Sequence, residues 1–87
     1  MKHASAATLG RIEPLLATLR ARSLLKEKSL GVFYLRGKAF LHFHDDPSGI
    51  FAGVRLEGAD FTRFRIATTG ERKALLKTID QYLAMKV

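Results

Sequence analysis

The sequence predicts one domain of the α+β class, in which an antiparallel sheet lies between two helices along the chain. Three observations support this class. Apolar residues recur at helical spacing through residues 5–22 and again through residues 71–85, and four segments separated by turn sequences lie between them. The expected architecture is a two-layer sandwich with the element order α-β-β-β-β-α, in which both helices cover one face of a four-stranded antiparallel meander.

The N-terminal helix is expected from about Ser5 or Thr8 to Arg22. Its apolar stripe consists of Leu9, Ile12, Leu15, Leu16 and Leu19. Pro14 interrupts this helix, because proline is tolerated in a first turn but kinks a helix interior. The helix therefore either bends at Pro14 or effectively begins there. Residues 23–29 are expected to follow as a basic connector.

Four strands are expected over residues 31–35, 38–45, 50–57 and 61–67. The segments between them have the composition of tight turns: Arg36-Gly37, Asp46-Pro47-Ser48-Gly49 and Gly58-Ala59-Asp60. Short connections of this kind make consecutive strands antiparallel neighbours. The C-terminal helix is expected over about Glu71 to Met85, and Thr68 with Glu71 has the spacing of a capping box.

The loop lengths also predict which residues of the sheet share a face. One face carries the row Val32, Leu41, Val54 and Phe64, and it is apolar enough to receive the helices. The opposite face is expected to carry the rows Phe33, Phe40, Arg55, Arg63 and Gly31, His42, Gly53, Arg65. This register places Arg55 opposite Arg63, a like-charge pair that costs stability unless an anion lies between them. It also leaves a shallow trough at the glycines beside His42.

The length and composition limit the kind of protein. The 87 residues suffice for a single domain, residues 1–87, and a hydrophobic content of 47% is enough to fold it. The chain contains no cysteine, which excludes disulfides and thiolate metal sites. No apolar run reaches about 18 residues, and the first residues lack the apolar segment of a signal peptide. We therefore expect a cytoplasmic protein without a membrane partner.

The charge is the main indication of a partner. Fifteen Lys and Arg residues against eight Asp and Glu residues give a formal net charge of +7. Between Arg20 and Lys38 the chain has six basic residues and one acidic residue, Glu27. Such an excess of positive charge attracts polyanions over long distances.

The candidate binding site is the aromatic and basic face of the predicted sheet. Its residues are Phe40, His42, His44, Phe51, Arg55, Arg63 and Arg65. Because rings stack on bases and guanidinium groups bind phosphates, the favoured hypothesis is a non-catalytic module that binds nucleic acid or another polyanion. The alternative is a structural role, in which a second copy of the chain or another protein covers this face. A homodimer or another protein partner is expected, because a chain this short has a thin core and dimerisation adds buried area.

Two histidines are the candidates for metal binding or catalysis. His42 and His44 project from the same face of one strand, so both reach a single metal ion. Candidates for a third ligand are His3, Asp45 and Asp46. Strand histidines are more often surface or cross-strand partners, so no metal or other cofactor is expected. A small His-dependent or metal-binding enzyme is the third hypothesis, with the same two histidines as its proton-transfer groups.

The segment from Gly31 to Ile66 resembles small, uncharacterised bacterial proteins that consist of one α+β domain. The resemblance centres on residues 39–49, with the sequence Ala-Phe-Leu-His-Phe-His-Asp-Asp-Pro-Ser-Gly. Because such proteins have no known activity, the resemblance implies no catalytic or binding residues. It implies a bacterial, cytosolic protein.

Overall fold

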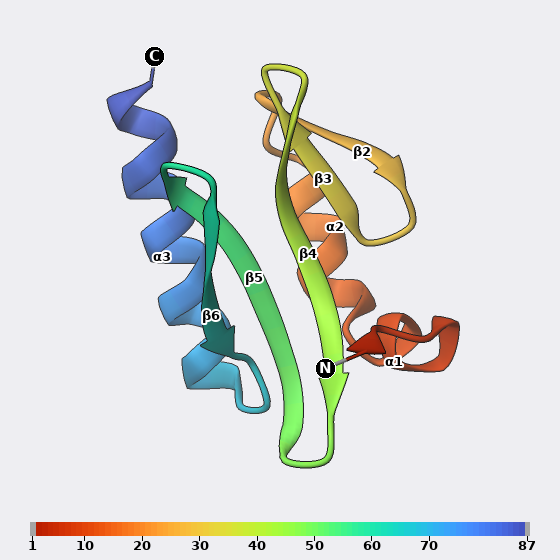
Figure 1. Ribbon diagram of the computed structural model, residues 1–87. Coiled ribbons are helices and arrows are strands. Elements are labelled where there is room, and N and C mark those ends of the chain that lie inside the picture. Colours follow the sequence, from red (N-terminus) through yellow and green to blue (C-terminus); the bar gives the residue numbers. More distant parts are fainter. Residues whose placement is uncertain (1, 87) are drawn as a thin grey trace.

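Nine elements build the fold in the computed structural model, which describes residues 2–86 apart from the side chain of residue 57 (Figure 1). The strands are β1 (Lys2–His3), β2 (Leu25–Ser29), β3 (Val32–Leu35), β4 (Lys38–Asp46), β5 (Gly49–Glu57) and β6 (Asp60–Arg65). The helices are α1 (Ala6–Arg11), α2 (Glu13–Arg20) and α3 (Thr69–Met85).

The strands form one antiparallel sheet in the order β2-β3-β4-β5-β6. β1 pairs with the far end of β4, beyond the residues that pair with β3. Figure 1 shows α2 behind β3 and β4, and α3 behind β5 and β6, so both helices cover the same face of the sheet. The predicted α+β class and the antiparallel meander beside a helix layer are confirmed.

The sheet contains two strands, β1 and β2, that the sequence did not predict. Residues 23–29, expected to be a connector, contain β2, in which Leu25 is buried and pairs with Leu35. The other residues of β2 are charged or polar, so the segment has the composition of a loop. β1 is two residues long, too short for a periodic pattern. The sheet therefore has six strands where four were expected.

The N-terminal helix is interrupted at Ile12, two residues before Pro14. α2 begins at Glu13, which places Pro14 in its first turn. A start at the proline is one of the two outcomes expected from the sequence, and the first turn is where a missing N–H costs least. α2 ends at Arg20, slightly earlier than the predicted Arg22.

The predicted capping box begins α3. The Thr68 hydroxyl accepts a hydrogen bond from the Glu71 N–H (3.1 Å), and the Glu71 carboxylate accepts one from the Thr68 N–H (3.0 Å). These two bonds satisfy donors that a helix start otherwise leaves free. Within residues 2–86, none of the helices combines the length and the apolar character that crossing a membrane requires.

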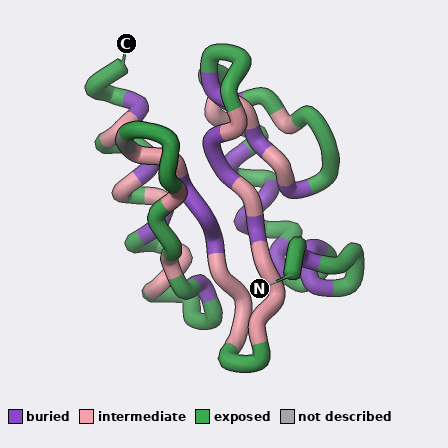
Figure 2. Tube along the Cα trace, in the orientation of Figure 1, coloured by how far each residue is buried: buried purple, intermediate pink, exposed green. Residues whose placement is uncertain are grey.

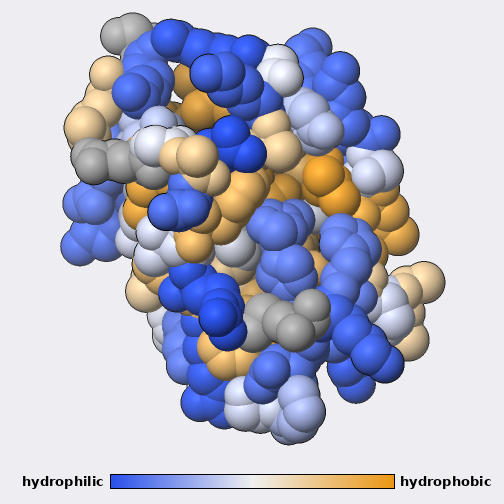
Figure 3. Space-filling view, in the orientation of Figure 1, coloured by the Kyte–Doolittle hydropathy of each residue, from blue (hydrophilic) through white to orange (hydrophobic). Residues whose placement is uncertain are grey.

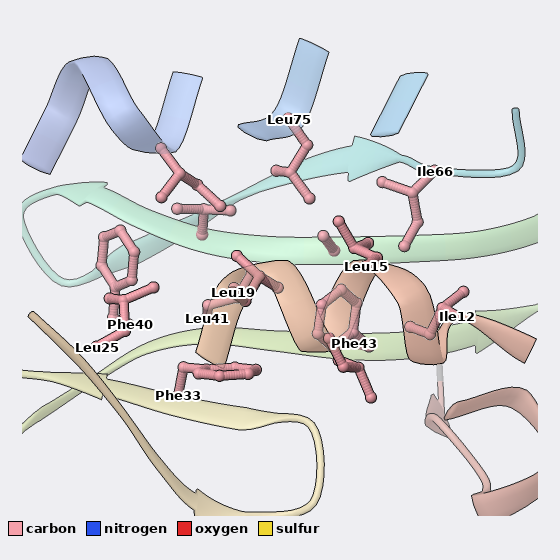
Figure 4. Close-up of a cluster of buried hydrophobic side chains, with 14 of the residues drawn as sticks. Ile12, Leu15, Leu19, Leu25, Phe33, Phe40, Leu41, Phe43, Ile66 and Leu75 are labelled. Atoms are coloured by element: carbon pink, nitrogen blue, oxygen red, sulfur yellow. The ribbon is translucent and has the colours of Figure 1, made fainter. Parts of the chain in front are cut away.

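The hydrophobic core lies between the sheet and the helices. In Figure 2 the central parts of β4 and β5 are buried, and Figure 4 shows side chains from both layers meeting there. Its fully buried members include Ile12, Leu16, Leu19, Phe33, Leu41, Phe43, Val54, Ile66, Leu75 and Ile79. Removing this apolar surface from water is the main favourable contribution to folding.

A bulge in β4 at Phe40 changes the predicted register of the first hairpin. Tyr34 faces Ala39, as the two-residue turn predicts, but Phe33 faces Leu41, which leaves Phe40 as the extra residue. Phe33 is 0% and Phe40 is 3% exposed. The Phe40 ring stacks on a tyrosine of α3, with ring centroids 5.6 Å apart. The expectation that Phe33 and Phe40 lie on the face away from the helices is therefore wrong.

The other two hairpins differ in how well the sequence predicted them. The β4–β5 register is the predicted one, with Leu41 opposite Val54. In the β5–β6 hairpin, Val54 faces Thr62 instead of Phe64. This hairpin closes on a two-residue turn, Gly58-Ala59, and an irregularity follows in β5. Together they shift the pairing by two residues.

The shift separates the two arginines that were expected to face each other. Arg63 lies opposite Gly53, so the predicted pairing of Arg55 with Arg63 is wrong. Because side chains alternate with a period of two, a two-residue shift leaves each residue on its predicted face. The correction therefore changes which residues are neighbours and not which face carries the arginines.

We expect Phe40→Ala to lower the free energy of unfolding by about 3–5 kcal/mol, because it removes a buried ring from the core. Phe61→Ala removes a ring that is half-buried on the opposite face, and it should cost less. Urea unfolding followed by circular dichroism measures both. Equal costs would contradict the burial of Phe40, and Phe40→Leu tests the same point if the alanine variant does not fold.

Candidate functional site

The face of the sheet away from the helices, called the open face from here on, carries most of the candidate residues. Figure 3 looks onto this face and shows hydrophilic side chains around and between apolar ones. The alternation of the strands and the side-chain contacts place on it Lys26, Lys28, Val32, Tyr34, His42, His44, Phe51, Arg55, Phe61, Arg63 and Arg65.

A series of ring contacts crosses the open face from β1 to β5. The ring centroids of His3 and His44 are 6.3 Å apart, and those of His44 and His42 are 4.3 Å apart. His42 in turn contacts Phe61 edge to face, with centroids 4.5 Å apart. The guanidinium carbon of Arg55 lies 4.7 Å from the Phe61 ring centroid, a cation–π distance. The contacts hold four rings and one guanidinium group in fixed relative positions.

Gly53 allows His42 and Phe61 to meet across β5. A Cβ atom at position 53 would lie 2.8 Å from His42 Nε2, so the imidazole occupies the space that a side chain would need. The trough predicted beside His42 is therefore filled by His42 itself. Gly31, the other glycine expected there, instead lies in the β2–β3 turn against Leu9 of α1.

Both strand histidines favour their neutral forms. Burial is the largest cause that lowers the pKa of His42, and the charges of His44, His3 and Arg55 act in the same direction. Burial is also the largest cause that lowers the pKa of His44. His44 Nδ1 forms no hydrogen bond of good geometry within the described residues, although the backbone of Lys2 lies close enough to favour the protonated ring.

Six of the seven predicted site residues lie on the open face, and Phe40 is the exception. The half-buried ones are His42, His44, Phe51 and Arg55, and the exposed ones are Arg63 and Arg65. Two cross-strand rows connect them: His42, Gly53 and Arg63, and next to it His44, Phe51 and Arg65. Their role in binding stays a prediction.

The structure also brings residues to this face that the sequence analysis left out. Lys26 and Lys28 arrive with β2, and His3 arrives with β1, neither of which was expected as a strand. Val32 was assigned to the helix side, and the bulge in β4 places it on the open face instead, together with Tyr34. When residues 31–41 are assigned to the two faces of the sheet in strict alternation, nothing in the sequence indicates the bulge.

A shallow hollow of about 270 Å³ lies beside His42, with walls from His3, Val32, Ala39, Leu41 and Phe61. Among the residues that the structure describes, no carboxylate lines this hollow, so acid–base chemistry there would depend on His3 and His42 alone. In the same part of the chain, no group of three His, Asp or Glu side chains is placed to hold a metal ion.

The carboxylate of Asp45 joins β4 to the start of α1. It accepts hydrogen bonds from the Thr8 hydroxyl (2.6 Å) and from the Ser5 N–H (3.0 Å), at the start of α1. These bonds, with Thr8 as the larger cause, hold the pKa of Asp45 below its usual value. Asp45 therefore lies on the helix side of β4, away from His42 and His44.

Comparison with known proteins finds no matching family model, no matching curated protein and no matching solved structure. The resemblance to small bacterial α+β proteins stays a prediction. Function is therefore inferred from the chemistry and geometry of the open face.

We expect Gly53→Ala to destabilise the protein by about 1–3 kcal/mol, because the new methyl group meets the His42 ring, which is held by its own neighbours. In a His42→Ala background the same substitution should cost much less, and a double-mutant cycle of urea midpoints measures the difference. Gly10→Ala is the control, since a Cβ at Gly10 has no atom within 4 Å. An equal cost in both backgrounds would show that His42 does not press on Gly53.

We expect the free energy of unfolding to fall as the pH is lowered from 7.5 to 5.5. The pKa values of His42 and His44 are lowered in the folded protein, so below pH about 6.5 the unfolded chain binds more protons and is favoured. Urea unfolding at several pH values measures the slope. The double variant His42→Gln/His44→Gln should flatten it, and an unchanged slope in that variant would contradict the assignment.

Proposed function

We propose that the open face binds single-stranded nucleic acid, with guanidinium groups on phosphates and aromatic rings on bases. The observation that carries this proposal is the uneven pairing of arginines. On the helix side Arg20 and Arg22 pair with carboxylates, whereas on the open face Arg55 and Arg63 form no ion pair with any side chain that the structure describes. The proposal includes the cytoplasmic location that the sequence predicts.

Two arginines on the helix side, Arg20 and Arg22, are neutralised within the protein. Arg20 is 2.5 Å from a carboxylate oxygen of Glu13 and 2.5 Å from one of Glu27. Arg22 donates to both carboxylate oxygens of Asp80, at 2.6 and 2.8 Å. Bidentate pairs of this kind fix the guanidinium group and leave little of its charge for a partner.

The open face has a different balance. Arg55 and Arg63 form no ion pair with any side chain that the structure describes. Arg65 is 3.8 Å from Glu71, at the edge of an ion-pair contact. Lys26 and Lys28 add to the positive charge on the β2 side. Asp46, at the end of β4, is close enough to Arg63 for the two charges to interact, but cations outnumber acidic groups on this face. Such an excess of positive charge attracts a polyanion and holds it in a salt-dependent way.

Aromatic rings lie among these cations. Phe51 and Phe61 are half-buried, so each keeps part of its ring exposed to a base. Tyr34 is also half-buried, and the centroid of its ring lies 5.6 Å from Lys28 Nζ. Stacking on such rings contributes about 1–3 kcal/mol per base and tolerates any sequence. The arrangement supports a binding face with little base preference.

The same charges argue against a homodimer through the open face. A two-fold axis would bring the patch onto itself, so its cations would approach cations of the second copy in an interface with few acidic side chains. The large apolar side chains that are exposed within residues 2–86 are Leu24, Leu30 and Met85, which lie in turns and at the end of α3. They do not form an apolar patch on the open face.

We expect a mixed-sequence single-stranded oligonucleotide to bind with an affinity that falls steeply with salt, as fluorescence anisotropy measures. Arg63→Gln should weaken binding and reduce the slope of log K against log salt by about 0.7, the loss of one phosphate contact. Lys73→Gln removes the same charge from the exposed side of α3 and should leave the slope unchanged.

Backbone-amide NMR with the same oligonucleotide locates the contact. Salt-dependent shifts at residues 42–44, 51–55 and 61–65 would support the proposal. Salt-insensitive binding, or equal slopes for the two variants, would refute it. Unperturbed spectra with linewidths too broad for 87 residues would favour the alternative in which a second copy already covers the face.

A further inference from the structure

A second hollow, called the basic hollow from here on, lies at the end of the sheet where the first hairpin approaches α3. Its volume is about 210 Å³. Four basic side chains line it above two aromatic rings: Arg36, Lys38, Arg55 and Lys86, with Phe40 and Tyr82. Arg36, Lys38 and Phe40 are close together in the chain, and the tertiary structure brings β5 and the end of α3 to them.

The charge in the basic hollow is uncompensated. Among the described residues, no carboxylate lines the cavity and none forms an ion pair with its four cations. The Nε atom of Arg55 is buried and has no hydrogen-bond partner in the described part of the chain. A buried donor without a partner is costly.

Arg36 is held in a backbone conformation that disfavours it. Its φ is 53° and that of Gly37 is 81°, the signs required by the two central residues of a type I′ turn. Asparagine or glycine adopts this conformation more easily than arginine does. The Arg36 guanidinium donates a hydrogen bond to the Lys86 carbonyl, which ties the turn to the end of α3. An arginine in a conformation that disfavours it points to a role for its side chain.

The aromatic floor contacts one of the four cations. The Lys86 ammonium group lies 5.2 Å from the centroid of the Tyr82 ring, which stacks on Phe40. Arg55 forms the other wall, and its guanidinium group also lies over Phe61 of the open face. The basic hollow is thus adjacent to the proposed nucleic-acid face and shares one arginine with it.

We infer that the basic hollow binds a phosphomonoester group. Such a group carries a charge of about −1.5 to −2 at neutral pH and three acceptor oxygens, whereas a phosphodiester carries a single charge. Four cations around a small cavity therefore match a phosphomonoester better. Arg55 lines both the basic hollow and the open face. This part of the inference rests on the proposed function: the phosphomonoester is the terminal phosphate of a single strand bound on the open face.

The test compares one oligonucleotide in three forms, with a 5′-phosphate, with a 3′-phosphate, or with neither. One phosphorylated form should bind about tenfold more tightly than the unphosphorylated one, through charge-assisted hydrogen bonds. Arg36→Asn, which suits the turn, and Lys86→Gln should each remove most of this preference. Lys77→Gln, elsewhere on α3, is the matched control and should keep it.

The outcomes separate this inference from the proposed function. Arg63→Gln should weaken all three forms equally, since Arg63 does not line the basic hollow. If no oligonucleotide binds but inorganic phosphate or a nucleoside monophosphate shifts the amides of residues 36–40, and Arg36→Asn abolishes those shifts, the phosphate site stands and the strand proposal fails.

Two results would overturn the inference. One is the absence of any end preference together with the absence of phosphate-induced shifts in residues 36–40. The other is an end preference that survives in both Arg36→Asn and Lys86→Gln. Circular dichroism checks that the variants fold. If Arg36→Asn does not fold, the result for Lys86→Gln decides whether the inference holds.

Discussion

The bulge at Phe40 is the constraint on which the arrangement of both surfaces depends. Because two residues of β4 face one position of β3, Phe40 turns towards the helix layer and Phe33 enters the core. Strict alternation would instead leave both phenylalanines on the open face and remove the stacking partner of Tyr82. The aromatic floor of the basic hollow is therefore a consequence of one extra residue in one strand.

A second constraint is the absence of a side chain at Gly53, which links the histidines to the arginines. The His42 ring lies over Gly53 and contacts Phe61, and Phe61 in turn carries the Arg55 guanidinium group. This places Arg55 where it borders both the open face and the basic hollow. The packing of the neutral His42 ring against Phe61 therefore helps to fix the position of the Arg55 guanidinium group.

The candidate site was predictable to the extent that local alternation holds. The β4–β5 hairpin has a four-residue turn sequence and no irregularity next to it, so the positions of His42, His44 and Phe51 followed from the chain. β2 escaped prediction because Leu25 is its single buried apolar residue, and charged residues at the other positions resemble a connector. The shift between β5 and β6 arises from a two-residue turn combined with an irregularity, and a sequence read with period two detects neither.

The sequence by itself determined the fold class, the presence of a bend or a helix start near Pro14, the capping box of α3 and the excess of positive charge, because each depends on residues close together in the chain. Only the tertiary structure decided which arginines are paired and which are free. Arg22 and Asp80 are far apart in the sequence and meet only when α3 packs beside the end of α2. The basic hollow has the same origin, since Arg55 and Lys86 reach the turn that carries Arg36 and Lys38 only as the sheet and α3 pack together.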